Sequence, residues 1–206
     1  WGNNRGLVLM KSFDLIHWTR TNIRFDQMSK EFAQIGCAWA PETVYDPATG
    51  RMMIYFTMRF GNEQNRLYYV YVNQDFNRIE SIPQILFEYP SGASAIDGDI
   101  TPIWNEERQK MEYHLFYVAH ESGSGIKQAV SDRIDGSYRF DPRWIDFEPV
   151  ACEAPNVWKR IGEDKWVLMY DIFGINPHNF GFVETSDFVH FKNLGRFNEG
   201  VMKTTN

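Results

Sequence analysis

The chain has 206 residues, of which 43% are hydrophobic and 23% are charged, so it is long enough to bury a core and is not disordered, collagen-like or a coiled coil. Twenty-one Lys and Arg against 27 Asp and Glu give a net charge of −6, the wrong sign for a protein that binds a phosphate backbone. No apolar run approaches the roughly 20 residues of a membrane-spanning helix. Neither nucleic acid nor a membrane is therefore expected as a partner.

Four segments share one pattern, in which a short apolar strand reaches Ser, Thr or Asn and then Asp. The segments are residues 9–18, 70–76, 128–133 and 183–191, and their shared aspartates are Asp14, Asp75, Asp132 and Asp187. These aspartates lie 61, 57 and 55 residues apart. A nearly constant period of this length indicates one recurring structural unit.

A second motif lies between these markers and opens a strand each time. It is Trp-Ala-Pro-Glu at 39–42, Asp-Gly-Asp at 97–99 and Glu-Ala-Pro at 153–155. Each motif is followed by a turn that carries Gly, Pro, Asn or Asp and then by a strongly apolar or aromatic strand, at 52–57, 112–118 and 165–170. Two strands joined by a hairpin, a third that ends at the marker aspartate and a last outer strand make one propeller blade.

The chain is therefore predicted to be all-β, with about three and a half blades that form one partial β-propeller domain, 1–206. Its aromatic content of 16% favours strands and also suits a sugar-binding cleft, where flat rings stack on sugar faces. The predicted blades are 1–29 (an outer half), 30–90, 91–148 and 149–200, and the best helical pattern, at 26–35, is expected to cross between blades. Because a propeller must close its ring, truncation at both ends is expected.

The motifs resemble those of glycoside hydrolase family 43, the five-bladed propeller enzymes that include β-xylosidases, arabinofuranosidases and endo-arabinanases. Ser-Phe-Asp-Leu-Ile-His-Trp at 12–18 is shared with related five-bladed hydrolases such as the fructosidases, whereas the order of the motifs at 39–42, 96–97 and 153–155 is more specific. The resemblance implies a glycosidase that cleaves arabinose, xylose or galactose linkages of plant-type polysaccharides or oligosaccharides with inversion. It also implies an extracellular or periplasmic location.

The resemblance further implies three carboxylates, of which two carry over to this chain. Glu153 matches the general acid, and Asp97 matches the aspartate that raises the pKa of that acid by like-charge repulsion. Aligning the repeats places Trp39, Asp97 and Glu153 at the same first position of successive inner strands. Asp99 lies on the same face of an extended strand as Asp97 and is the alternative to it.

The third carboxylate, the general base, is not identified in the chain. The resemblance places it before Trp1, and Asp14 is expected to cap a turn instead. It also places a histidine near a central metal ion after Asn206, so it allows a structural calcium ion near the axis; no other cofactor is expected. Low activity of the isolated chain, or a propeller that binds sugar without cleaving it, are both compatible with this sequence.

Several further residues have predicted roles. Trp39 is expected to line the sugar site, while Arg59 and His120 follow the second strand of a blade and are expected to hydrogen-bond substrate hydroxyls, unless they are loop residues without a role. Three other histidines are expected to be structural and to lie in strands: His17, His114 and His190. The five histidines give no metal-binding spacing. Cys37 and Cys152 are expected to be reduced and buried.

Overall fold

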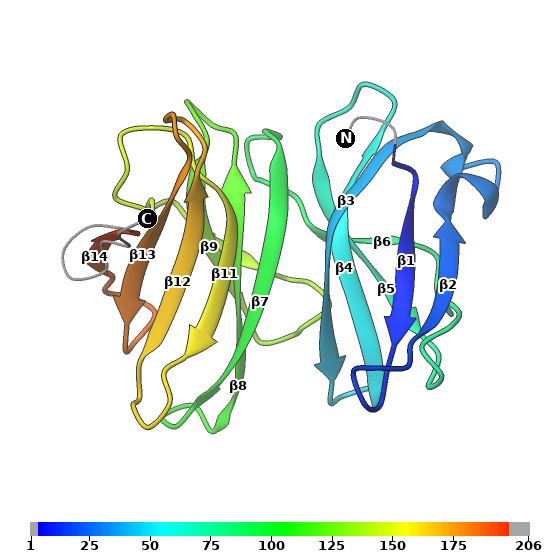
Figure 1. Ribbon diagram of the computed structural model, residues 1–206, viewed down its shortest axis with the longest axis horizontal. Helices are drawn as coiled ribbons and strands as arrows, with labels where there is room; N and C mark the ends of the chain where they lie inside the picture. The colour runs from blue at the N-terminus through cyan, green and yellow to red at the C-terminus, as the bar shows by residue number, and fades with distance from the viewer. Residues whose placement is uncertain (1–3, 198–206) are drawn as a thin grey trace. The chain divides into compact units, whose positions relative to one another are not determined.

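The computed structural model describes residues 4–197, and its regular structure is almost entirely β (Figure 1). The all-β fold predicted from the repeat is confirmed. The chain divides into two compact units, of which unit 1 comprises the residues up to Ile96 with Ile134–Gly136, and unit 2 comprises Asp97–Arg133 with the residues from Ser137 onward. None of the helices in the described range has the length and apolar character needed to cross a membrane.

Unit 1 contains a two-stranded and a four-stranded antiparallel sheet. The smaller sheet pairs β1 (Gly6–Lys11) with β2 (Thr19–Arg24). The larger sheet is a meander in chain order of β3 (Ile35–Asp46), β4 (Arg51–Phe60), β5 (Arg66–Val72) and β6 (Gln84–Phe87). Two short 3-10 turns, η1 (Phe25–Gln27) and η2 (Phe32–Gln34), connect the sheets in the segment where the sequence predicted a crossing between blades.

The hydrophobic core of unit 1 is shared by its two sheets. Leu7 and Leu9 of β1 belong to the same buried cluster as Phe56 and Met58 of β4. Phe25 of η1 stacks on Phe56 with ring centroids 4.8 Å apart. Because side chains of a strand alternate between its faces, the apolar residues at every second position of β1 point into this cluster.

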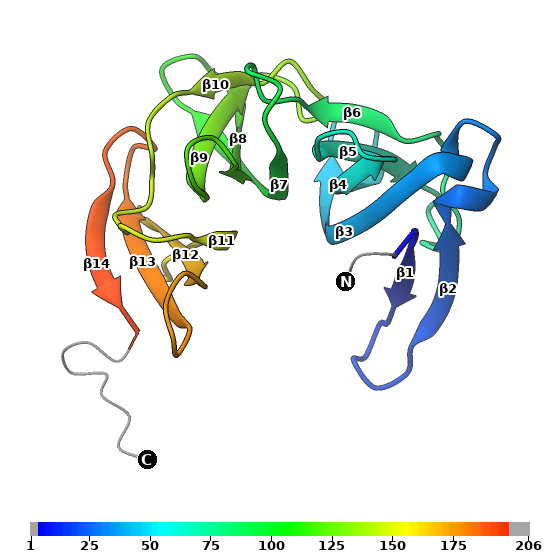
Figure 2. The same cartoon turned by 90° about the horizontal axis from the view of Figure 1, so that it is seen from above.

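Unit 2 contains two four-stranded antiparallel sheets with the same meander order. The first consists of β7 (Ala95–Asn105), β8 (Lys110–Ala119), β9 (Gly125–Ser131) and β10 (Arg139–Asp141), and the second of β11 (Glu153–Lys159), β12 (Trp166–Ile172), β13 (Asn179–Thr185) and β14 (Lys192–Arg196). Strand β11 contacts β8 and β9, so the sheets of unit 2 lie side by side (Figure 2). This is the blade pattern that the repeat predicted.

The marker aspartates of the first and last repeats cap identical turns. One carboxylate oxygen of Asp14 accepts the backbone N–H of His17 at 2.8 Å, and the other lies 2.7 Å from Nδ1 of the same histidine. Asp187 and His190 repeat both contacts at 2.8 and 2.7 Å. The capping role predicted for Asp14 is thus confirmed. The placement of His17 and His190 in strands is wrong, because the caps hold both in the turns that follow β1 and β13.

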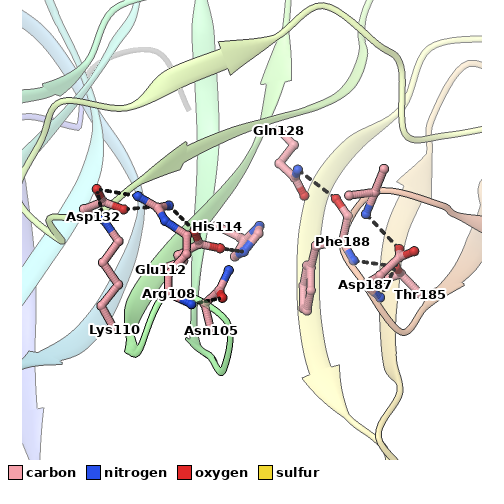
Figure 3. Close-up of polar contacts among 11 residues, drawn as sticks. Asn105, Arg108, Lys110, Glu112, His114, Gln128, Asp132, Thr185, Asp187 and Phe188 are labelled. Atoms are coloured by element: carbon pink, nitrogen blue, oxygen red, sulfur yellow. Dashed lines mark hydrogen bonds and ion pairs between the residues drawn. The ribbon is translucent and has the colours of Figure 1, made fainter.

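The turn at Asp187 places an apolar side chain on the neighbouring sheet of unit 2 (Figure 3). Phe188 is 3% exposed, and its ring centroid lies 4.4 Å from that of His114 and 5.0 Å from that of Trp166. The side-chain amide of Gln128 donates a 3.1 Å hydrogen bond to the carbonyl of Phe188. The third strand of one blade therefore ends in a contact that joins it to the blade before it.

A residue with left-handed backbone geometry recurs within each inner strand. Ala40, Asp97 and Ala154 have φ values of 45°, 52° and 52° and are spaced 57 residues apart. The strand register shifts next to Trp39 in β3 and next to Glu153 in β11. The predicted alignment is therefore wrong by one residue for Asp97: it occupies the left-handed position itself, one place after the position of Trp39 and Glu153.

Both cysteines are free and buried, as predicted. Cys37 lies on β3 in unit 1, and Cys152 directly precedes β11 in unit 2. Burial raises the pKa of both thiols, that of Cys152 to about 12. Neither thiol is therefore activated as a nucleophile.

Candidate active site

Glu153 is the first residue of β11, and the backbone on either side of it is tied to neighbouring chain segments. The N–H of Cys152 donates to the carbonyl of Ser124 at 3.0 Å, and the hydroxyl of Ser124 donates to the carbonyl of Cys152 at 3.1 Å. On the other side, the N–H of Ala154 donates to the carboxylate of Asp97 at 3.3 Å. The Glu153 side chain is half-buried, and these contacts fix the backbone from which it projects.

Asp97 brings a second carboxylate to Glu153 from the adjacent sheet of unit 2. Its burial, and after that the negative charge of Glu153, raise the pKa of Asp97 from 3.8 to about 6, although the hydrogen bond from the Ala154 N–H acts in the opposite direction. The structure therefore brings together the two carboxylates that the sequence singled out. Two neighbouring carboxyl groups resist being ionised together, because their negative charges repel each other. The pair therefore keeps a proton up to a higher pH than isolated carboxyl groups do.

The pKa of Glu153 is also raised, first by burial and then by the negative charge of Asp171, while His178 lowers it. Asp171 lies opposite Glu153 in the β11–β12 pair. The sequence predicted Asp97 as the residue that raises the pKa of Glu153. In the structure Asp171 is a further carboxylate that acts on Glu153. Because the repulsion between Asp97 and Glu153 is mutual, the role predicted for Asp97 stays a prediction.

Neither Asp171 nor His178 is among the residues predicted from the sequence. Regular pairing outward from the β11–β12 hairpin would place Ile172 opposite Glu153. The register shift that follows Glu153 moves its partner by one residue, to Asp171. Nothing in the residue types reveals this shift, so the sequence gives no signal that Asp171 lies opposite Glu153.

Asp99 has a different role from Asp97. It is 7% exposed, and one of its carboxylate oxygens accepts hydrogen bonds from the N–H of Val157 at 2.8 Å and from the side-chain amide of Asn156 at 3.2 Å. These bonds join β7 to β11 beyond the bulge. Of the two aspartates that the sequence left open, Asp97 is the one beside Glu153, and Asp99 fastens the strand that carries Glu153.

Trp39 and Arg59 come together in unit 1, on the paired strands β3 and β4. The guanidinium carbon of Arg59 lies 5.6 Å from the ring centroid of Trp39, within the range of a cation–π contact. Trp39 is half-buried and lines a cavity of about 570 Å³ together with Asn22 and Arg24. An aromatic ring beside hydrogen-bonding side chains has the chemistry of a sugar-binding surface.

His120 directly follows β8 in unit 2. Its side chain is exposed, and desolvation lowers the pKa of its imidazole. It forms no hydrogen bond within residues 4–197, so its predicted role in binding substrate stays a prediction. Over the same range no group of three or more His, Cys, Asp or Glu side chains could hold a metal ion. The structural calcium ion that the resemblance allows stays a prediction.

Solved structures of glycoside hydrolases resemble this chain closely in fold and distantly in sequence. A thermostable family-43 glycoside hydrolase superposes with a TM-score of 0.65 at 16% identity, over 93% of this chain and 65% of that one. An arabinanase of Bacillus subtilis gives 0.65 at 17% identity, over 92% and 67%. An exo-β-1,3-galactanase of Clostridium thermocellum gives 0.61 at 14% identity, over 91% and 42%. The chain thus has part of the five-bladed β-propeller fold and spans less than two thirds of the length of the first of these enzymes.

At the level of sequence, no curated protein matches the chain. A model of the family 43-related glycosyl hydrolases, described as "Probable glycosyl hydrolase domain", matches residues 1–203. That match covers nearly the whole sequence and includes all three inner-strand motifs. The chain therefore belongs to the family 43-related glycosyl hydrolase domains.

Proposed function

We propose that the chain is the part of a glycosidase that carries its general acid, Glu153, and the carboxylate that works with it, Asp97. The observation that supports this most directly is the juxtaposition of these two side chains from adjacent sheets of unit 2, with the pKa of both raised. Asp97 accepts a backbone N–H and interacts with the charge of Glu153, and Glu153 is also acted on by the carboxylate of Asp171 and the weakly basic His178.

In the proposed reaction, protonated Glu153 donates its proton to the glycosidic oxygen as the bond between that oxygen and the anomeric carbon breaks. A water molecule attacks the anomeric carbon from the opposite face and gives up a proton to a general base, which inverts the configuration. An inverting pair of carboxylates is roughly 6.5 to 9.5 Å apart, which leaves room for that water. Asp97, close to Glu153, would help to keep the acid protonated and would orient the sugar.

We infer that the substrate is a plant-type polysaccharide or oligosaccharide with arabinose, xylose or galactose linkages. Support comes from the structural relatives, which include an arabinanase and an exo-β-1,3-galactanase, and from the Trp39–Arg59 pair as a surface for a sugar ring. We also infer that the protein acts outside the cytoplasm, since polysaccharides are too large to cross a membrane unaided.

The test is hydrolysis of arabino-, xylo- and galacto-oligosaccharides, separated by chromatography, by the chain and two variants. Glu153→Gln removes the acid and keeps the side-chain shape, so hydrolysis should fall by about 10²- to 10⁴-fold. Glu163→Gln is the matched control, because Glu163 lies in the exposed turn before β12 and pairs with the surface cations Arg160 and Lys165. Equal activity of all three proteins would contradict the role of Glu153.

A second arm makes the test independent of the base. Azide is a nucleophile that needs no deprotonation, so it can attack the anomeric carbon while Glu153 protonates the departing oxygen. Formation of a glycosyl azide that depends on Glu153 would therefore demonstrate the acid even where water is not activated. Binding of an oligosaccharide without either product, lost in Trp39→Ala, would instead favour a propeller that binds sugar without cleaving it.

A further inference from the structure

Asp171 and Glu153 form an unusual pair across two antiparallel strands. The two residues are direct partners in the register of β11 and β12. Side chains of direct partners project from the same face of a sheet, with Cβ atoms about 4.5 to 5.5 Å apart, and like charges in this arrangement destabilise the pair. Both side chains are half-buried, which reduces the screening of their repulsion by water.

Neither carboxyl group is neutralised by a strong cation. Among residues 4–197, no Lys or Arg forms an ion pair with Glu153 or Asp171. The charged and titratable groups that act on Glu153 are Asp97 from β7, Asp171 from β12 and His178, which lies exposed just before β13. The fold thus places two other carboxyl groups around Glu153 and only one weakly basic side chain.

The position of Asp171 bears on the protonation of Glu153 beside Asp97. Asp97 is the more deeply buried of the two, and burial favours its neutral form. Burial alone would therefore favour a proton on Asp97. Asp171 is the direct strand partner of Glu153 in the β11–β12 pair, whereas Asp97 reaches Glu153 from β7 of the neighbouring sheet. The charge of Asp171 therefore favours the protonated form of Glu153.

We propose that Asp171 is a positioning residue for the acid: its carboxylate, fixed opposite Glu153 by the bulge in β11, directs the proton of the carboxyl cluster onto Glu153. The proton's use in glycoside cleavage rests on the function proposed above, whereas its location is a property of the folded chain alone.

The location of the proton is measured without any substrate. Carboxyl ¹³C chemical shifts of the 206-residue chain, labelled at the side-chain carboxyls of Glu and Asp, are followed from pH 3 to 8. The Glu153 signal is assigned by its absence in Glu153→Gln, and the Asp97 signal by its absence in Asp97→Asn. In Asp171→Asn, which removes the charge at nearly constant shape, the proton affinity of Glu153 should fall by about threefold or more. In Asp171→Glu, which keeps a charge, the proton affinity of Glu153 should fall less.

Asp164→Asn is the matched control, because Asp164 is an exposed aspartate in the turn that precedes β12, and it should leave the Glu153 titration unchanged. An unchanged titration of Glu153 in a folded Asp171→Asn chain, with native circular dichroism, would overturn the inference. Should Asp171→Asn not fold, Asp171→Ser removes the same charge with a smaller side chain, and the same two outcomes apply. A shifted titration in a chain that neither hydrolyses an oligosaccharide nor forms a glycosyl azide would uphold Asp171 and count against the proposed function only.

Discussion

Asp97 and Ala154 are equivalent residues of consecutive repeats, 57 residues apart, and the carboxylate of the first accepts a hydrogen bond from the N–H of the second at 3.3 Å. Both have a φ of 52°. This geometry is uncommon for residues with a side chain, although Asp and Asn tolerate it better than most. The left-handed turn redirects Asp97 toward the next sheet of unit 2, where it meets the strand that begins with Glu153.

Asp97 should make the stability of the chain depend on pH. Its pKa is raised from 3.8 to about 6 by folding, so between these values the native state binds more protons than the unfolded state. The sign follows: stability is fully present below pH 4 and is lost as pH rises through about 6, by roughly 2 to 3 kcal/mol. Asp97→Asn removes this loss and suits the left-handed geometry, so it should be more stable than the parent at pH 7.5.

Urea unfolding at pH 4.5 and pH 7.5 measures this difference. The parent and Asp97→Asn should converge at the lower pH and separate at the higher one. Asp75→Asn is the control, because Asp75 is 76% exposed and only 4.0 Å from its cation, and such pairs contribute little. A parent chain that gains stability over Asp97→Asn as the pH rises would show that the carboxylate of Asp97 is stabilised in the fold.

The repeat could be recognised in the sequence because each blade has the same structural requirements. A turn that closes on Asp requires its carboxylate as a cap, which is why Asp14 and Asp187 form the same hydrogen bonds in different units. Apolar second strands must be buried on both faces, which is why 52–57 and 112–118 lie within β4 and β8, and all but the first residue of 165–170 lies within β12. These constraints act on residue type, so they leave a pattern that periodicity can detect.

The details of the site were not readable for a physical reason. A single left-handed residue changes the register of a strand by one place, and Ala or Asp at that position gives no warning of it. The bulge after Glu153 selects Asp171 as its partner, and the left-handed φ of Asp97 sets the direction of its carboxylate. The motifs therefore identify Asp97 and Glu153, while the groups that control their protons depend on backbone geometry.

Asp99 should matter for stability and not for the proton on Glu153. Asp99→Ala leaves the partly buried N–H of Val157 without its 2.8 Å acceptor and should lower the free energy of unfolding by about 1 to 2 kcal/mol. Asp99→Asn retains an acceptor oxygen and should lose less. Chemical unfolding measures the free energies of unfolding of the two variants. The carboxyl ¹³C titration of Glu153 tests whether its proton is affected. A Glu153 titration that shifts in Asp99→Asn as much as in Asp97→Asn would assign Asp99 to the site.

Phe188 and Leu15 occupy the same place in matching turns, with φ values of 57° and 61°, but in different surroundings. Phe188 is 3% exposed against His114 and Trp166, whereas Leu15 is 79% exposed. Phe188→Ala should therefore lower the free energy of unfolding by about 3 to 5 kcal/mol, and Leu15→Ala should change it by less than about 0.5 kcal/mol. Equal losses, measured by thermal and urea unfolding, would mean that the turn itself and not the packing of Phe188 sets the cost.

Gly181 of β13 is required because the ring of Tyr170 lies directly on its backbone. A Cβ at this position would be 2.3 Å from Cε2 of Tyr170 and 2.5 Å from Cζ. These distances are far inside van der Waals contact, and Tyr170 is a fully buried member of β12, so neither strand can move away freely. Gly181→Ala should lower the free energy of unfolding by about 1 to 3 kcal/mol. In a Tyr170→Ala background the same substitution should cost less than half as much, since the ring is gone, and a cost that is equal in both backgrounds in urea unfolding would refute the contact as its cause.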